Sequence, residues 1–131
     1  MGAYGGMDNG DFAFYFADIF VESVQYGDRT GLCDVMKEIK DKPLWDQLTA
    51  LRGQADKAGV APQDYCRNQI KKTDKVYDNA ARSWTYQYCT EFGFYQTPSK
   101  EHPMRSEKLL GEKYWVDYCN DIFGIKLNIK S

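Results

Sequence analysis

The amino-acid sequence predicts an all-α fold, a single helical bundle of about five helices. Apolar residues recur every three or four positions through most of the 131 residues, and glycine or proline bounds most of these runs. A chain of this length forms one domain, in which folding buries roughly two thirds of the unfolded surface. Only the tail 125–130 alternates with the period of a β-strand, and the sequence offers no second strand to pair with it.

Three helices are predicted in the N-terminal half of the chain. The run Asp11–Tyr26 carries large apolar residues at helical spacing and is followed by Gly27, which is typical of a helix C-terminus. A second, shorter helix covers Leu32–Asp41. Pro43 suits the first turn of a third helix, which ends at Gly59.

The C-terminal half contributes a short helix, a central helix and a last helix. The short one begins at 61–64, and the proline-free segment Asp74–Gly93 predicts the central one. After a polar loop at Pro98–Pro103, Ser106 is expected to cap the last helix, which ends at Gly124.

The charge balance argues against nucleic acid and membrane partners. The chain has 17 basic and 19 acidic residues, and no run of like charge is long enough to bind phosphates or an anionic bilayer. No apolar stretch approaches the roughly 20 residues that cross a bilayer. The N-terminus also lacks a signal-peptide pattern, so we expect either a cytosolic protein or a piece of a longer chain.

Neither catalytic residues nor a metal site are expected in this chain. Its single histidine, His102, lies in a proline-bounded loop, so no nucleophile has an evident general base. Acidic residues such as Asp11 and Asp18 are spaced as on solvated helix faces rather than as a catalytic pair. The cysteines form no C-x-x-C pair, which with one histidine argues against zinc, and we expect no cofactor.

The cysteines admit two interpretations. Cys33, Cys66, Cys89 and Cys119 either form two disulfides in an exported domain, which we favour, or remain reduced as core thiols. The spacing alone does not decide between the two.

The segment Ser83–Thr97, SWTYQYCTEFGFYQT, surrounds one carboxylate with aromatic residues. On a helix, Trp84, Gln87, Tyr88 and Glu91 share one side through their three- and four-residue offsets. That side is a candidate ligand-binding face, because it places a carboxylate and an amide among rings. The alternative is a surface glutamate that extends into solvent beside packed aromatics.

This segment resembles a family signature. Arg82–Thr97, RSWTYQYCTEFGFYQT, is similar to the string W-x-Y-Q-x-C-T-E-F-G-x-Y-Q-T of the prolyl carboxypeptidase and dipeptidyl peptidase II family of serine exopeptidases. Two flanking segments look similar as well, Phe20–Met36 (FVESVQYGDRTGLCDVM) and Pro103–Gly124 (PMRSEKLLGEKYWVDYCNDIFG). The resemblance covers most of 11–124.

The resemblance implies a helical cap domain. In that family the catalytic part is an α/β-hydrolase fold, and a helical bundle is inserted between the nucleophilic serine and the later aspartate and histidine. By this resemblance 1–10 is a flexible lead-in or linker, 11–124 is the cap, and 125–131 is a tail leading into a missing catalytic domain. The implied function is substrate gating in a proline-preferring serine exopeptidase, with no hydrolysis by this chain alone.

The resemblance also implies partners, a compartment and cysteine pairs. The partners are the catalytic α/β-hydrolase domain and a peptide substrate, and the compartment is extracellular or lysosomal/vacuolar. Cys33 is expected to pair with Cys119, and Cys66 with Cys89. Neither the oligomeric state nor the choice between amino- and carboxy-terminal trimming follows from the sequence.

Individual site residues are implied as well. Glu91 of the C-T-E motif is the implied polar contact, which would pair with a terminal ammonium of the substrate in a water-poor cleft. Trp84 and Gln87 would lie beside it, while Trp84 and Tyr95 would supply apolar walls for a proline-containing substrate. No catalytic residue is implied, because Ala3 stands where the family's G-x-S-Y-G-G-M nucleophile elbow has serine; a glycine-rich linker explains the same letters.

A second function remains open. A stand-alone helical protein that uses its aromatic face to bind a partner or a small ligand would have the same exposed apolar surface.

Overall fold

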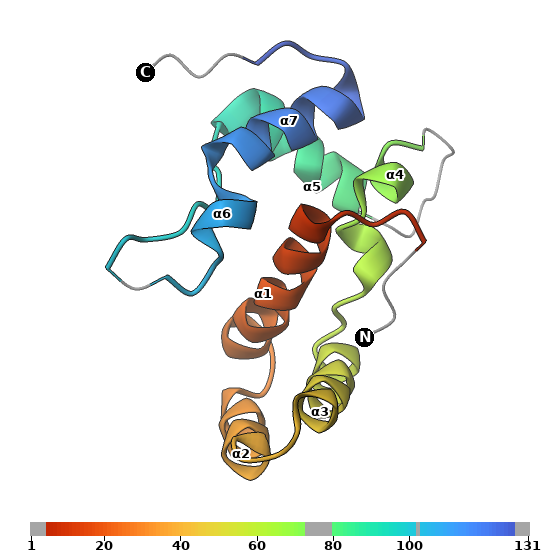
Figure 1. Cartoon of the computed structure of the whole chain (residues 1–131). Helices are drawn as coiled ribbons and strands as arrows, with labels where there is room; N and C mark the ends of the chain where they lie inside the picture. The colour runs from red at the N-terminus through yellow and green to blue at the C-terminus, as the bar shows by residue number, and fades with distance from the viewer. Residues whose placement is uncertain (1–4, 73–79, 102, 128–131) are drawn as a thin grey trace.

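The chain is all-helical in the computed structural model, which describes residues 5–72, 80–101 and 103–127 and has no β-strand within them (Figure 1). Its α-helices are α1 (Asn9–Gln25), α2 (Arg29–Ile39), α3 (Leu44–Lys57), α4 (Arg67–Ile70), α5 (Ala81–Gln87), α6 (Glu107–Leu110) and α7 (Glu112–Phe123). A 3-10 turn, Pro62–Asp64, precedes α4, and a π-helix, Tyr88–Phe92, continues α5. The predicted fold class is confirmed.

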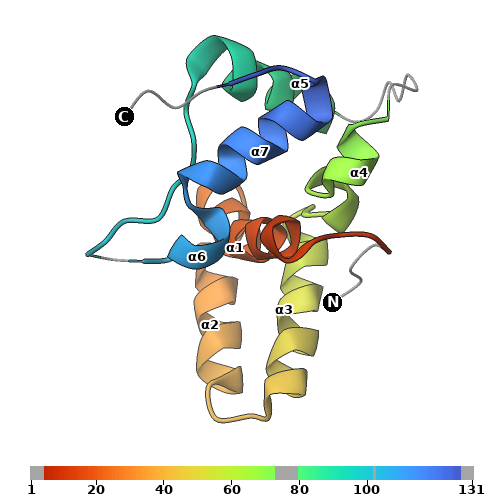
Figure 2. The same cartoon turned by 45° about the horizontal axis from the view of Figure 1, so that its top comes forward.

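The helices fall into two groups that meet at α1. Helices α2 and α3 lie side by side and extend away from the rest of the molecule, and α1 packs against both (Figure 2). At the other end, α7 packs against α4 and α5, and α6 packs against α1. None of the helices in the described ranges is long and apolar enough to cross a membrane.

Aspartate side chains cap the N-terminal ends of α1 and α2. The Asp11 amide donates to the Asp8 carboxylate at 2.8 Å, and the Gly31 amide donates to Asp28 at 2.8 Å. Such a side-chain cap stabilises a helix by about 1 kcal/mol. The observed bounds of α1, α2 and α3 lie within a few residues of the prediction.

The last two predicted helices are more broken than expected. Ser106 caps α6 as predicted, but Gly111 is extended (φ −68°, ψ 174°) and separates α6 from α7. The predicted central helix is represented by α5 and the π-helix, and its portion at 74–79 lies outside the described residues. The tail 125–127 forms no strand, and 128–131 are not described.

Two apolar clusters form the core. One surrounds Trp115 of α7, whose indole meets Phe14 of α1 edge-on with ring centroids 4.8 Å apart. The other lies between α1 and the end of α3 and contains Tyr15, Ile19 and Ala55. Helix α1 contributes to both clusters, so it is the structural centre of the domain.

A buried ion pair ties α1 to α4 and α7. The Asp11 carboxylate is fully buried and accepts hydrogen bonds from the Arg67 amide at 2.8 Å, from Arg67 Nε at 3.0 Å and from Arg67 Nη2 at 2.9 Å. The Tyr114 hydroxyl donates to the same carboxylate at 3.0 Å. Burial raises the pKa of the Asp11 carboxyl, against the lowering effect of the hydrogen bonds from Arg67.

A second buried pair ties the loop before α6 to α1. Arg105 Nη2 lies 2.6 Å from the Asp18 carboxylate, and both side chains are nearly inaccessible. Burial raises the pKa of Asp18. The interpretation of Asp11 and Asp18 as solvated residues is therefore wrong: each faces a cationic partner that lies far along the chain, which spacing on one helix does not reveal.

Candidate functional site

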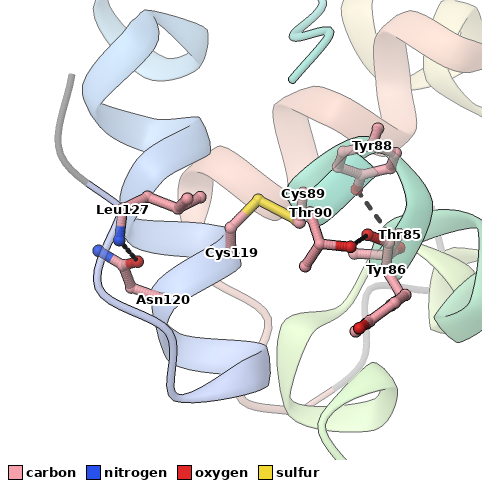
Figure 3. Close-up of a disulfide and its surroundings, with 8 residues drawn as sticks. All are labelled: Thr85, Tyr86, Tyr88, Cys89, Thr90, Cys119, Asn120 and Leu127. Carbon is pink, nitrogen blue, oxygen red and sulfur yellow. Dashed lines mark hydrogen bonds between the residues drawn. A yellow bond between two sulfur atoms is a disulfide. The ribbon is translucent and has the colours of Figure 1, made fainter. Parts of the chain in front are cut away.

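One disulfide, Cys89–Cys119, joins the π-helix to α7 and fixes the backbone of the C-T-E segment (Figure 3). The predicted pairs Cys33–Cys119 and Cys66–Cys89 are therefore wrong. Cys33 is an exposed free thiol on α2, a helix that packs mainly on α1 and α3, whereas Cys119 is bonded to Cys89 of the π-helix. Cys66 is a buried free thiol.

The π-helix has the wider backbone turn that its name denotes. The Gly93 amide donates to the Tyr88 carbonyl at 3.1 Å, and Gly93 itself is left-handed (φ 61°). The Thr90 hydroxyl donates to the Tyr86 carbonyl at 2.7 Å, as Figure 3 shows. Single π-helical turns occur frequently at functional sites.

Three of the predicted site residues lie on the exposed side of α5 and the π-helix. Trp84 is 60% exposed, and Gln87 and Glu91 are exposed as well. Tyr88, which was expected on the same side, is buried, with its ring centroid 6.0 Å from that of Trp115. Glu91 Oε1 lies 3.4 Å from the Thr90 hydroxyl and faces solvent rather than a closed cleft.

Tyr95, the fourth predicted site residue, has a different environment. Its ring stacks on Trp115 with centroids 6.2 Å apart and 7° between the planes. Burial raises the pKa of the Tyr95 hydroxyl. One face of the residue also lines an open groove of about 390 Å³, formed by Gly93, Phe94, Tyr95, Thr97, Glu112, Val116 and Leu127.

The structure adds exposed aromatics that sequence reasoning did not select. Phe92 is 66% exposed and Phe94 is 70% exposed, although both belong to the quoted motif. Trp84 and Tyr86 of the same segment are exposed as well, and we call these four residues the aromatic surface. The position of Phe92 and Phe94 in the motif could have identified them as site residues. No sequence pattern could have identified the groove residues of α7, because only tertiary packing brings α7 beside the motif.

Two residues considered for catalysis, Ala3 and His102, lie outside the described residues. Within 5–72, 80–101 and 103–127, histidine, cysteine and acidic side chains form no group of three that could hold a metal ion. The candidate site consists of exposed rings, an exposed carboxylate and a groove.

Replacing Gly93 with alanine is expected to cost about 1 kcal/mol of unfolding free energy, because a left-handed φ strains any residue with a Cβ. A Cβ at Gly93 meets no atom within 4 Å, so the cost is confined to the backbone. Urea unfolding followed by circular dichroism measures it. The control is Gly53→Ala in the interior of α3, where helix propensity favours alanine and stability rises by up to about 1 kcal/mol.

Comparisons with known proteins show the family of this chain. A family model described as serine carboxypeptidase S28 matches residues 13–131. The chain is also 30% identical over 118 residues to the probable serine protease EDA2 of Arabidopsis thaliana, an alignment that covers 87% of this chain and 24% of that protein. No solved structure matches. The chain spans about a quarter of the length of this relative, and it belongs to the serine carboxypeptidase S28 family.

Proposed function

We propose that this chain is the substrate-gating helical cap of a proline-preferring serine exopeptidase. The observation that carries the proposal is the exposed aromatic surface beside Glu91, on an all-helical member of a serine peptidase family. Protein domains seldom leave several large rings of one short segment exposed unless another molecule or domain covers them. The proposed cover is the catalytic α/β-hydrolase domain, with peptide substrate held between the two.

Glu91 is the polar contact in this proposal. In the chain alone it faces water, where an ion pair contributes little. Once a catalytic domain covers the aromatic surface, water is excluded and the same carboxylate attracts a substrate ammonium more strongly. Trp84 then offers an apolar wall to a prolyl ring.

The test is Glu91→Gln in the full-length protease that contains this domain. We expect kcat/KM on a proline-containing peptide with a free amino terminus to fall by roughly tenfold or more, the effect of losing one charge-assisted hydrogen bond. The same peptide with an acetylated amino terminus should be much less affected. Glu101→Gln, an exposed glutamate in the neighbouring loop, serves as the control.

Unchanged kinetics in Glu91→Gln would remove the role of this carboxylate. A full-length protein without peptidase activity, in which the aromatic surface still binds a partner, would instead favour the stand-alone binding protein.

The proposed compartment is extracellular or lysosomal. The Cys89–Cys119 disulfide supports it, because disulfides persist in oxidising compartments and are rare in the cytosol.

A further inference from the structure

We propose that the groove beside the motif binds a positively charged group of a peptide, with Glu112 as its counter-ion. The groove lies between the chain that follows the π-helix and the exposed side of α7. Its volume of about 390 Å³ falls within the range of roughly 300–1,000 Å³ typical of ligand sites. The inference rests on the proposed function, since it names a substrate class for the same surface.

The charges of the groove favour a cation. Glu112 is the charged residue of the lining, and no lysine or arginine accompanies it there. Lys113, its neighbour on α7, is paired with Asp117 one turn further along the same helix. Glu112 is exposed and lies in the first turn of α7, so a ligand can reach its carboxylate.

The remaining walls favour a cation that is attached to an apolar group. Phe94 presents an exposed ring, and aromatic faces attract ammonium and guanidinium groups. Val116 and Leu127 supply an aliphatic floor, on which a prolyl or aliphatic side chain can rest. The groove is thus suited to a peptide in which an apolar residue stands next to a positive charge.

Contacts with residues outside the groove fix the positions of its walls. The Leu127 amide donates to Asn120 Oδ1 at 2.8 Å, which fixes the tail against α7. Tyr95 is held by its stack on Trp115, and Gly93 by its bond to the Tyr88 carbonyl. Because these supports lie in the core or on the backbone, changing Glu112 alters the charge of the groove without removing its walls.

The experiment titrates the isotope-labelled 131-residue chain with short peptides and follows backbone amide shifts by NMR. The peptides are acetyl-Lys-Pro-amide, acetyl-Gln-Pro-amide and Ala-Pro-amide with a free amino terminus. We expect shifts around Glu112, Val116 and Leu127 with one or both charged peptides, and weaker binding of the neutral one. The first peptide reports a side-chain cation and the third a terminal ammonium.

Glu112→Gln should weaken the charged peptides by roughly three- to tenfold, between the effects of an exposed and a buried charge pair, and leave the neutral peptide unchanged. Raising the salt concentration should also weaken the binding of the charged peptides. Glu107→Gln, on the first turn of α6 and outside the groove, is the matched control.

Equal binding of all three peptides, or charged-peptide binding that Glu112→Gln leaves unchanged, would overturn the inference. Because the titration needs no catalysis, its result is independent of whether Glu91→Gln alters peptidase activity. The two experiments therefore distinguish an error in the proposed groove from an error in the proposed cap function.

Discussion

Replacing Asp11 with alanine is expected to lower the free energy of unfolding by about 3–5 kcal/mol, the cost of leaving a buried charge without its partner. Asp11 is fully buried, and its carboxylate accepts hydrogen bonds from the Arg67 amide, from the Arg67 guanidinium and from the Tyr114 hydroxyl. Its loss leaves the Arg67 guanidinium, whose side chain is only 15% exposed, with the half-exposed Asp8 as its remaining carboxylate. Urea unfolding at neutral pH measures the change.

The matched control is Asp117→Ala, which breaks the exposed pair with Lys113 on α7 and should change stability by less than about 1 kcal/mol. A double variant, Asp11→Leu with Arg67→Met, should recover part of the loss, because it removes both buried charges. A loss below about 1 kcal/mol in Asp11→Ala would show that the buried pair does not hold α1 to α4.

Removing the disulfide is the second large change. The double variant Cys89→Ala, Cys119→Ala should lose about 3.5 kcal/mol, the chain-entropy value for a cross-link of this loop length, and about 10 °C in Tm. The two cysteines are 30 positions apart, so the cross-link restricts a long stretch of the unfolded chain. Scanning calorimetry on the oxidised protein measures the shift.

Cys33→Ser is the control, since this thiol is exposed and unpaired, and it should leave Tm unchanged. Peptide mapping without reductant should recover Cys89 joined to Cys119, with Cys33 open to alkylation. A recovered Cys33–Cys119 peptide would contradict the structure and restore the pairing that the family resemblance implies.

The first three helices were predictable because their signals are local. Apolar spacing, Gly27 after the first run, and Pro43 and Gly59 around the third are all signals set within a few residues. The break at Gly111 was not recognised, because a lone glycine inside a helical pattern has no unique meaning. The π-helical turn was also missed, since the amphipathic pattern does not report whether a carbonyl accepts from the fourth or the fifth residue.

The candidate site was predictable only in its location. The motif predicts the segment of the candidate site, and three of its selected residues are exposed there. Tyr88 is buried rather than exposed beside Trp84, because the position of Trp115, whose ring it meets, depends on how α7 packs. The disulfide pairing failed for the same reason: the distance between cysteines is a tertiary quantity, which neither spacing nor resemblance determines.

The Cys89–Cys119 bond has a consequence for proteolysis. The exposed loop between the motif and α6 lies entirely within the segment that this bond closes. A cut after Lys100 therefore leaves two fragments that stay covalently joined until a reductant is added. In a compartment rich in proteases, the domain can be nicked at this exposed loop and still keep the aromatic surface and α7 in one molecule.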